Sequence, residues 1–185
     1  KINIGKKIKI GIIMKKTTKI VFLAIMLSFS LILYYIESML PPLNILAPGA
    51  KLGLSNILSL TCLFIFGFKD AMAVLLMRIF LSSTFYGGMS TFLYSFAGGV
   101  LSIISMTFVK MMNLKSISPI GISIIGSFFF NIGQLVVSAM VLSNIKIFYY
   151  LPYMSLFSIL TGFFTGLSSL FLINHIKKII KTEQR

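Results

Sequence analysis

The stretch Ile117–Leu142, ISPIGISIIGSFFFNIGQLVVSAMVL, decides the fold class, because it carries no charged side chain over a length that can cross a membrane. About 17–25 predominantly apolar residues in helical form span a hydrocarbon core of about 30 Å. In lipid such a stretch has to be a helix, since its backbone N–H and C=O groups must be satisfied within the segment. The stretch therefore predicts a transmembrane helix.

The rest of the chain has the same character. Only three of the 185 residues are acidic, 57% are hydrophobic, and the mean hydropathy is +1.01. The apolar runs are continuous rather than alternating, which favours helices over a membrane β-barrel. We predict an all-α membrane protein with six transmembrane helices, at Ile20–Leu40, Leu52–Phe68, Ala71–Phe85, Met89–Met112, Ile117–Leu142 and Ile147–Ile173.

The basic residues fall mainly on one side of these spans, which argues against nucleic acid as the reason for the net charge of +14. On the other side we expect only Lys51 and Lys146. The positive-inside rule then places both termini in the cytoplasm. We expect a multi-pass protein of the bacterial cytoplasmic membrane, with a basic segment at 1–18, a transmembrane domain at 19–175 and a basic tail at 176–185. Residues 1–13 precede a Met14-Lys-Lys sequence that is typical of a native N-terminus.

A polar stripe follows the fifth span, and it has two interpretations. Its members recur at helical spacing and so share one helix face: Ser123, Ser127, Asn131, Gln134 and Ser138. In lipid this face must point inward, toward other helices or a wet cavity. The serines favour hydrogen bonds between helices. The amides of Asn131 and Gln134 are equally compatible with binding a ligand.

Arg78 lies in the middle of the third span, where a charge costs about 2.5–3.5 kcal/mol on insertion scales. It needs a counter-charge, water or an anionic ligand. The first span offers a stripe of Ser30, Tyr34 and Glu37, so Glu37 is one candidate partner. The alternative is that Arg78 and Lys51 together hold the negative group of a ligand.

The segment between the first two spans, residues 37–56, is rich in proline and glycine yet apolar, so we expect it to fold back over the helices. We predict a binding cavity in the outer half of the bundle. Its walls would be Glu37, Arg78, Tyr94, Asn131 and Gln134, and the segment carrying Lys51 and Asn56 would close it. Two smaller expectations are that Asp70 caps the third helix and that Gly162 and Gly166 permit close helix packing.

These residues also carry a family resemblance. Pro48-Gly-Ala-Lys-Leu-Gly-Leu-Ser-Asn56, Arg78, Gly87-Gly88, Tyr94-Ser-Phe-Ala-Gly-Gly99 and Asn131-Ile-Gly-Gln134 resemble the Gx transporter family, also labelled heptaprenyl diphosphate synthase component I. The resemblance covers about residues 18–173. That family is similar to the substrate-binding S-components of energy-coupling-factor vitamin transporters.

The resemblance implies six helices, cytoplasmic termini and a first loop that closes over the substrate. It also implies a patch of small residues on the first helix that docks a transmembrane coupling subunit, for which Ala24 and Ser28 are the candidates. Its expected partners are therefore a coupling subunit, cytoplasmic ATPases, membrane lipid and a small-molecule substrate.

Catalysis by the chain itself is not expected. Magnesium diphosphate chemistry needs clustered carboxylates, whereas Glu37, Asp70 and Glu183 are far apart in the sequence. No Walker-type phosphate loop is present, and we expect neither a cofactor nor a metal site. The preferred hypothesis is uptake of a small anionic vitamin- or quinone-precursor-like molecule. The alternatives are a noncatalytic subunit of heptaprenyl diphosphate or isoprenoid-quinone synthesis, and a partner of a membrane redox complex.

Overall fold

The computed structural model describes residues 16–39, 53–112 and 118–183. Within these ranges all regular structure is helical, which confirms the predicted all-α class. A π-turn, η1 (Ser83–Gly87), and a short 3₁₀ turn, η2 (Ile145–Tyr150), join longer helices. The longer helices are α2 (Lys16–Met39), α3 (Asn56–Ile65), α4 (Phe68–Ser82), α5 (Gly88–Met111), α6 (Pro119–Val141) and α7 (Leu151–Glu183).

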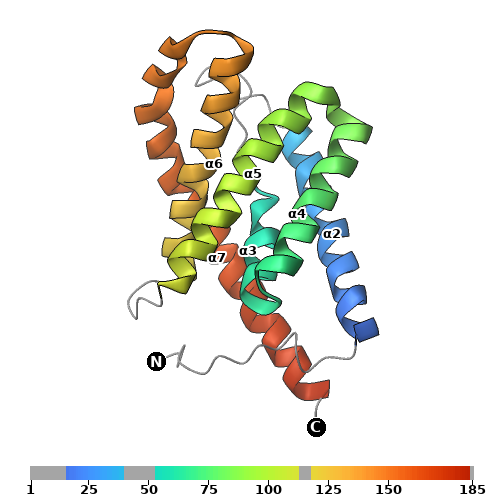
Figure 1. Cartoon of the computed structure of the whole chain (residues 1–185). Coiled ribbons are helices and arrows are strands. Elements are labelled where there is room, and N and C mark those ends of the chain that lie inside the picture. The colour runs from blue at the N-terminus through green and yellow to red at the C-terminus, as the bar shows by residue number, and fades with distance from the viewer. Residues whose placement is uncertain (1–15, 40–52, 113–117, 184–185) are drawn as a thin grey trace.

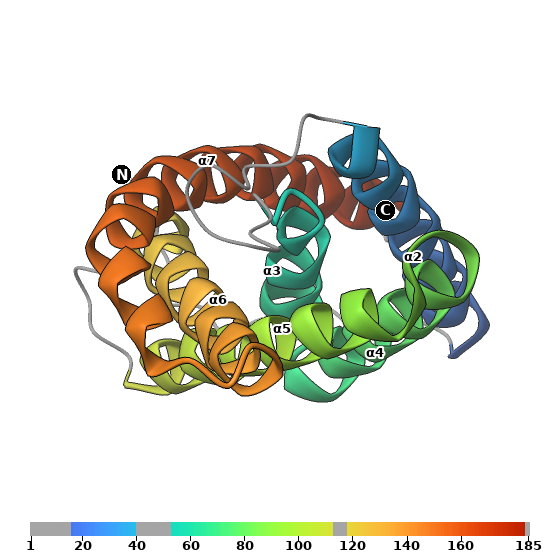
Figure 2. The ribbon, with the colours of Figure 1, turned by 90° about the horizontal axis from the view of Figure 1, so that it is seen from above.

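The helices alternate in direction along the bundle, so the start of α2 and the end of α7 lie at the same end (Figure 1). Seen along its axis, the bundle is a ring of α2, α4, α5, α6 and α7 around the short helix α3 (Figure 2). Eight of the residues of α3 are buried, and they lie on all sides of the helix. An all-round apolar helix of this kind belongs in an interior.

Four of these helices are long and apolar enough to cross a membrane: Lys16–Met39, Gly88–Met111, Pro119–Val141 and Ile145–Ile179. At 1.5 Å per residue, α3 is about 15 Å long and α4 about 22 Å, both shorter than the hydrocarbon core of about 30 Å. The predicted second span is present as a shorter helix, since α3 begins at Asn56 rather than Leu52 and ends at Ile65. The predicted third span is present as α4, which has the expected length of 15 residues but begins three residues earlier. That all six cross the membrane stays a prediction.

Small residues bring α5, α6 and α7 close together. A Cβ atom added at Gly133 of α6 would lie 2.7 Å from the Cα of Gly98 on α5. One added at Gly162 of α7 would lie 2.5 Å from the Cα of Ile124 on α6, and Gly166 is similarly close to Ile120. The predicted packing role of Gly162 and Gly166 is therefore confirmed. Their partner is α6 of the same chain.

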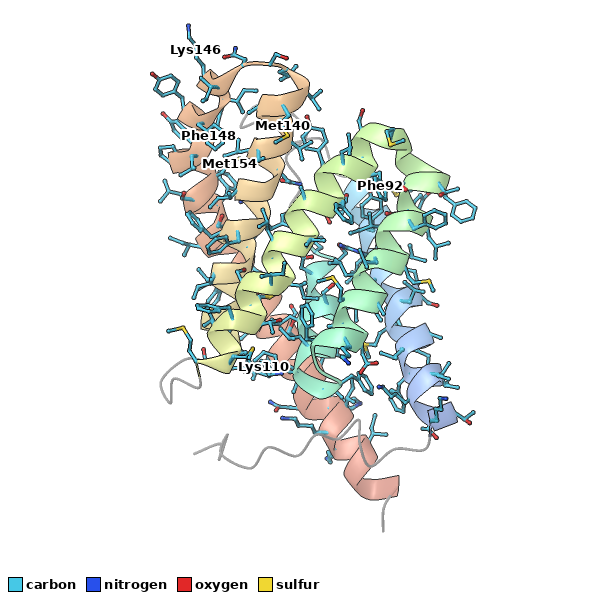
Figure 3. The ribbon with its side chains drawn as sticks, viewed as in Figure 1. Phe92, Lys110, Met140, Lys146, Phe148 and Met154 are labelled. Carbon is cyan, nitrogen blue, oxygen red and sulfur yellow. The ribbon has the colours of Figure 1, made fainter. Side chains whose placement is uncertain are left out.

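Lysine side chains hold together the end of the bundle at which α2 begins. Lys110 Nζ of α5 donates to the Leu63 carbonyl oxygen at 2.5 Å, near the end of α3, and lies 4.7 Å from the centre of the Phe64 ring. Figure 3 shows Lys110 at this end of the bundle and Lys146 at the opposite end.

Lys19 of α2 forms a 2.8 Å ion pair with Asp70. The prediction that Asp70 caps α4 was wrong, because Gly67 holds the cap position and Asp70 lies within the first turn.

Candidate functional site

The predicted polar stripe of α2 faces the interior. Ser30, Tyr34 and Glu37 are all buried, together with Met26 one turn earlier. Their spacing of about one helical turn puts them on a single face, while the opposite face of α2 is exposed. The Ser30 hydroxyl donates to the Ser55 carbonyl oxygen at 3.4 Å, so this face contacts the residues that lead into α3.

Glu37 fastens the chain that enters α3. Its carboxylate accepts hydrogen bonds from the backbone N–H groups of Gly53, at 2.5 Å, and Leu54, at 3.1 Å. Gly53 has a φ of +76°, a conformation that glycine adopts without strain, and it packs against the Phe130 ring of α6. Glu37 is only 8% exposed. Its carboxylate charge is therefore held inside the bundle by backbone donors.

Arg78 is buried on α4, with 3% of its surface exposed. Its Nε atom has no hydrogen-bond partner within the described residues. Glu37 and Tyr34 interact with it electrostatically, but no ion pair joins Arg78 to Glu37 in the described part of the chain. The predicted pairing of these two charges is thus an interaction at a distance. It leaves the hydrogen-bonding capacity of the guanidinium group unfilled at Nε.

The structure brings four of the predicted residues into the same half of the bundle. Because the helices alternate in direction, the ends of α2 and α4 lie near the starts of α3 and α5 (Figure 1). Glu37, Arg78, Asn56 and Tyr94 belong to these helix ends. Asn56 is buried and its backbone N–H donates to the Gly53 carbonyl, whereas Tyr94 is half-buried. Lys51 and most of the predicted closing segment lie outside the described residues.

Asn131 joins α6 to α7 instead of facing this half of the bundle with its amide group. Its Nδ2 atom donates to the Ser158 hydroxyl at 2.7 Å and to the Met154 carbonyl at 3.2 Å. Both amide hydrogens are thereby used between helices. Ser123 forms a second link, 2.7 Å from the Thr165 hydroxyl. For Asn131 and Ser123 these bonds favour the interpretation as contacts between helices, while a ligand-binding role of Asn131 stays a prediction. Gln134 is buried about one turn further along α6.

Two residues were missing from the predicted cavity wall. Tyr34 was recognised as part of the α2 stripe but not as a group that acts on Arg78. Gly53 was part of the recognised motif, yet its contact with Glu37 connects positions sixteen residues apart. Two features of the sequence could have pointed to these contacts. Tyr34 and Glu37 are about one helical turn apart, and Gly53 stands just ahead of α3.

The predicted docking patch is open to the surroundings. Ala24 and Ser28 are exposed on the outward face of α2, where the Ser28 hydroxyl donates to the Ala24 carbonyl oxygen at 3.0 Å. Apolar side chains surround them: Ile20, Val21, Ile25, Phe29 and Ile32 are all exposed. The small-residue ridge at Gly162 and Gly166 does not offer a second patch, because α6 covers it.

The family model of heptaprenyl diphosphate synthase component I matches residues 8–172. The chain belongs to this family. The match covers every helix described above from its start, apart from the last turns of α7. The searches of curated proteins and of solved structures found no match to this chain.

Membership in this family agrees with the motifs quoted in the sequence analysis. The words component I in the family description imply that the synthase has at least one further subunit. In chemical terms the described residues contain no group of three or more His, Cys, Asp or Glu side chains placed to hold a metal ion. The feature that remains to be explained is the buried guanidinium of Arg78, held among helix ends and beside an anchored carboxylate.

Proposed function

We propose that this chain is a noncatalytic membrane subunit that binds a small anionic molecule at Arg78. The observation that carries the proposal is a buried arginine whose Nε lacks a hydrogen-bond partner in the described residues. A buried donor left without a hydrogen-bond partner costs about 1–3 kcal/mol, and more when the group is charged. Intramembrane ionisable residues are accordingly found mostly at functional sites.

The position of Glu37 supports a ligand at Arg78 over a purely structural ion pair. Carboxylates that neutralise an arginine frequently form two parallel hydrogen bonds with its guanidinium group. Glu37 instead directs its two oxygens at the backbone of Gly53 and Leu54. An anionic ligand beside Arg78 would supply the acceptor that Nε lacks among the described residues.

The form of activity that we propose is uptake, with this subunit acting like an S-component. A coupling subunit would dock on the outward face of α2, where Ala24 and Ser28 leave room for close helix contact. Cytoplasmic ATPases would supply the energy. Support for this arrangement comes from the exposed apolar face of α2 around those two small residues.

A second candidate function is favoured by the family description. A component I of heptaprenyl diphosphate synthase would be a membrane subunit for a catalytic partner. Copurification separates the two functions: a coupling subunit with ATPases supports uptake, whereas a soluble prenyltransferase supports synthesis.

The direct test of the binding site is native mass spectrometry of the purified protein, looking for a retained anionic molecule. Arg78→Met should weaken its binding by about 1.5–3 kcal/mol, the range for a hydrogen bond to a charged group. Lys146→Met, which removes an exposed cation at the α6–α7 turn, is the matched control and should leave binding unchanged. A structural role predicts another result: Arg78→Met would misfold, and a combined Arg78→Met, Glu37→Gln variant would recover both folding and binding. That recovery would reject Arg78 as a ligand residue.

A further inference from the structure

We propose that the end of the bundle where α3 stops binds the phosphate group of an anionic lipid between Lys110 of α5 and Lys177 of α7. This end is the one at which α2 begins, whereas Arg78 lies among the helix ends of the other half (Figure 1). The lipid site is therefore separate from the proposed site at Arg78 and does not rest on it.

The last turn of α3 fixes the position of Lys110. Its Nζ atom donates to the Leu63 carbonyl oxygen at 2.5 Å and lies 4.7 Å from the centre of the Phe64 ring. Carbonyl groups in the last turn of a helix lack partners within the helix and carry partial negative charge, so they attract a cation. An ammonium group has three N–H donors, and the bond to Leu63 is the one that Lys110 forms within the described residues. The group can still donate to a further acceptor.

The packing of α7 against α3 brings Lys177 to the same level of the bundle. Both helices run in the same direction (Figure 1), and the Ser169 hydroxyl of α7 donates to the Ile57 carbonyl oxygen of α3 at 2.9 Å. Leu63 lies six residues beyond Ile57 and Lys177 eight residues beyond Ser169, so their levels differ by about 3 Å along the helix axes. Ile176 is 4% exposed and belongs to the same apolar core as Leu63, while Lys177 itself is exposed.

The two ammonium groups repel each other, and no described side chain compensates them. Lys177 acts on Lys110 electrostatically as a like charge. Of the three acidic residues in the chain, Glu37 is bonded to the backbone near the start of α3, and Asp70 is paired with a lysine of α2. Glu183 lies six residues beyond Lys177, whereas side chains on a helix meet at spacings of three or four. An anion between the two lysines would remove their repulsion.

The surroundings of the two lysines favour a lipid as the source of that anion. Lys110 lies in the last turn of α5, a helix long and apolar enough to cross a membrane. Phe108 and Met111 beside it are 65% and 77% exposed, so in a membrane they would contact acyl chains. The predicted orientation puts this end on the cytoplasmic side, where basic pockets between transmembrane helices bind anionic headgroups. A lipid satisfies both features, because its phosphate meets the lysines while its chains cover apolar side chains of α5.

Native mass spectrometry of the purified full chain, titrated with dioleoylphosphatidylglycerol, tests the site. Dioleoylphosphatidylcholine has the same acyl chains and no net charge, so it is the reference lipid. We expect the wild-type protein to bind the anionic lipid at least about tenfold more tightly, since two lysines contribute. Lys177→Gln should weaken that binding by about fivefold, the effect of one lysine near an anionic lipid surface. The substitution keeps the contact of Lys110 with α3. Lys69→Gln changes another exposed lysine at this end and should leave the affinity unchanged.

Three results would overturn the proposal. The first is equal affinity of the wild-type protein for the two lipids, a comparison that does not depend on how well the variants fold. The second is an equal loss in Lys177→Gln and Lys69→Gln, which would mean that the lipid responds only to the overall charge of this end. The third is displacement of the lipid by excess inorganic phosphate with dependence on Lys177, which would assign the site to a soluble anion. Ligand binding at Arg78 should be unchanged in Lys177→Gln, so the two sites fail separately.

Discussion

The Glu37 carboxylate lies 2.5 Å from the backbone nitrogen of Gly53, and this hydrogen bond ties the end of α2 to the chain that enters α3. A buried carboxylate is thereby satisfied by backbone donors rather than by the buried arginine nearby. The consequence is that α3, too short to cross a membrane alone, is held in the centre of the bundle. The residue that makes this possible is a glycine with positive φ.

Gly53→Ala should destabilise the protein by about 1–2 kcal/mol from its left-handed conformation, plus the cost of a new contact. The added Cβ would lie 3.0 Å from Nδ2 of Asn56. Gly88→Ala is a comparison that adds a Cβ without a new contact: Gly88 has a positive φ of +62° and open space around it, but its ψ of −169° lies in a region that only glycine adopts readily. The stability of both variants is measured as the midpoint of unfolding in a titration with a denaturing detergent. A loss at Gly53 of less than about 1 kcal/mol would contradict the backbone conformation and the packing described for this glycine.

Both tails are expected to be cytoplasmic, because the lysine-rich ends of α2 and α7 lie at one end of the bundle. In a Cys62→Ala background, cysteines placed at Lys16 and Lys178 should resist an impermeant maleimide in intact cells. A cysteine at Lys146 should react. Labelling of either tail from outside would reverse the orientation and with it the side from which a ligand enters.

Bulk added to the exposed small residues of α2 should disrupt partner docking. Ala24→Leu combined with Ser28→Leu should remove the coupling subunit from the copurified complex, since close helix contact needs small side chains. Ser168→Leu, on an exposed position of α7, is the control. Retention of the complex by the double variant would place docking elsewhere, and Gly162 and Gly166 would be poor replacements because α6 already covers them.

Asn131→Ala should lower stability without a specific loss of ligand. Its two hydrogen bonds join α6 to Met154 and Ser158 of α7. Interhelical hydrogen bonds in membrane proteins contribute about 0.6 kcal/mol on average and up to about 1.7 kcal/mol. A double-mutant cycle with Ser158→Ala gives the coupling, and the exposed Asn174 is the control position. Zero coupling energy would show that the contact does not stabilise the helix pair.

Lys110→Met should weaken the end of the bundle where α3 stops. The lysine donates to the Leu63 carbonyl and lies over the Phe64 ring, so we expect a loss of about 1.5–3 kcal/mol. Lys69→Met removes an exposed lysine at the same end as a control. Equal effects of the two substitutions on the unfolding midpoint would mean that overall charge, rather than this contact, matters.

The one-dimensional pattern was enough to predict the helices. Long uncharged runs such as Ile117–Leu142 must form helices in lipid, because their backbone N–H and C=O groups have to bond to one another within the segment. The inward face of α2 was likewise readable from the spacing of Ser30, Tyr34 and Glu37. Helix boundaries were less accurate at α3, where glycine and serine residues precede the helix and the apolar pattern continues through them.

The partners of the polar side chains could not be predicted from spacing. Asn131 and Glu37 both have inward positions, but only the tertiary structure decides that Asn131 bonds to α7 and that Glu37 bonds to the backbone at Gly53. The physical reason is that the cost of burying a polar group fixes that it must find a partner, not which one. Sequence by itself determined an all-helical membrane chain with a buried arginine. Only the tertiary structure, with α3 packed inside the ring of helices, shows that the Glu37 carboxylate bonds to the backbone at Gly53 and that Nε of this arginine has no partner among the described residues.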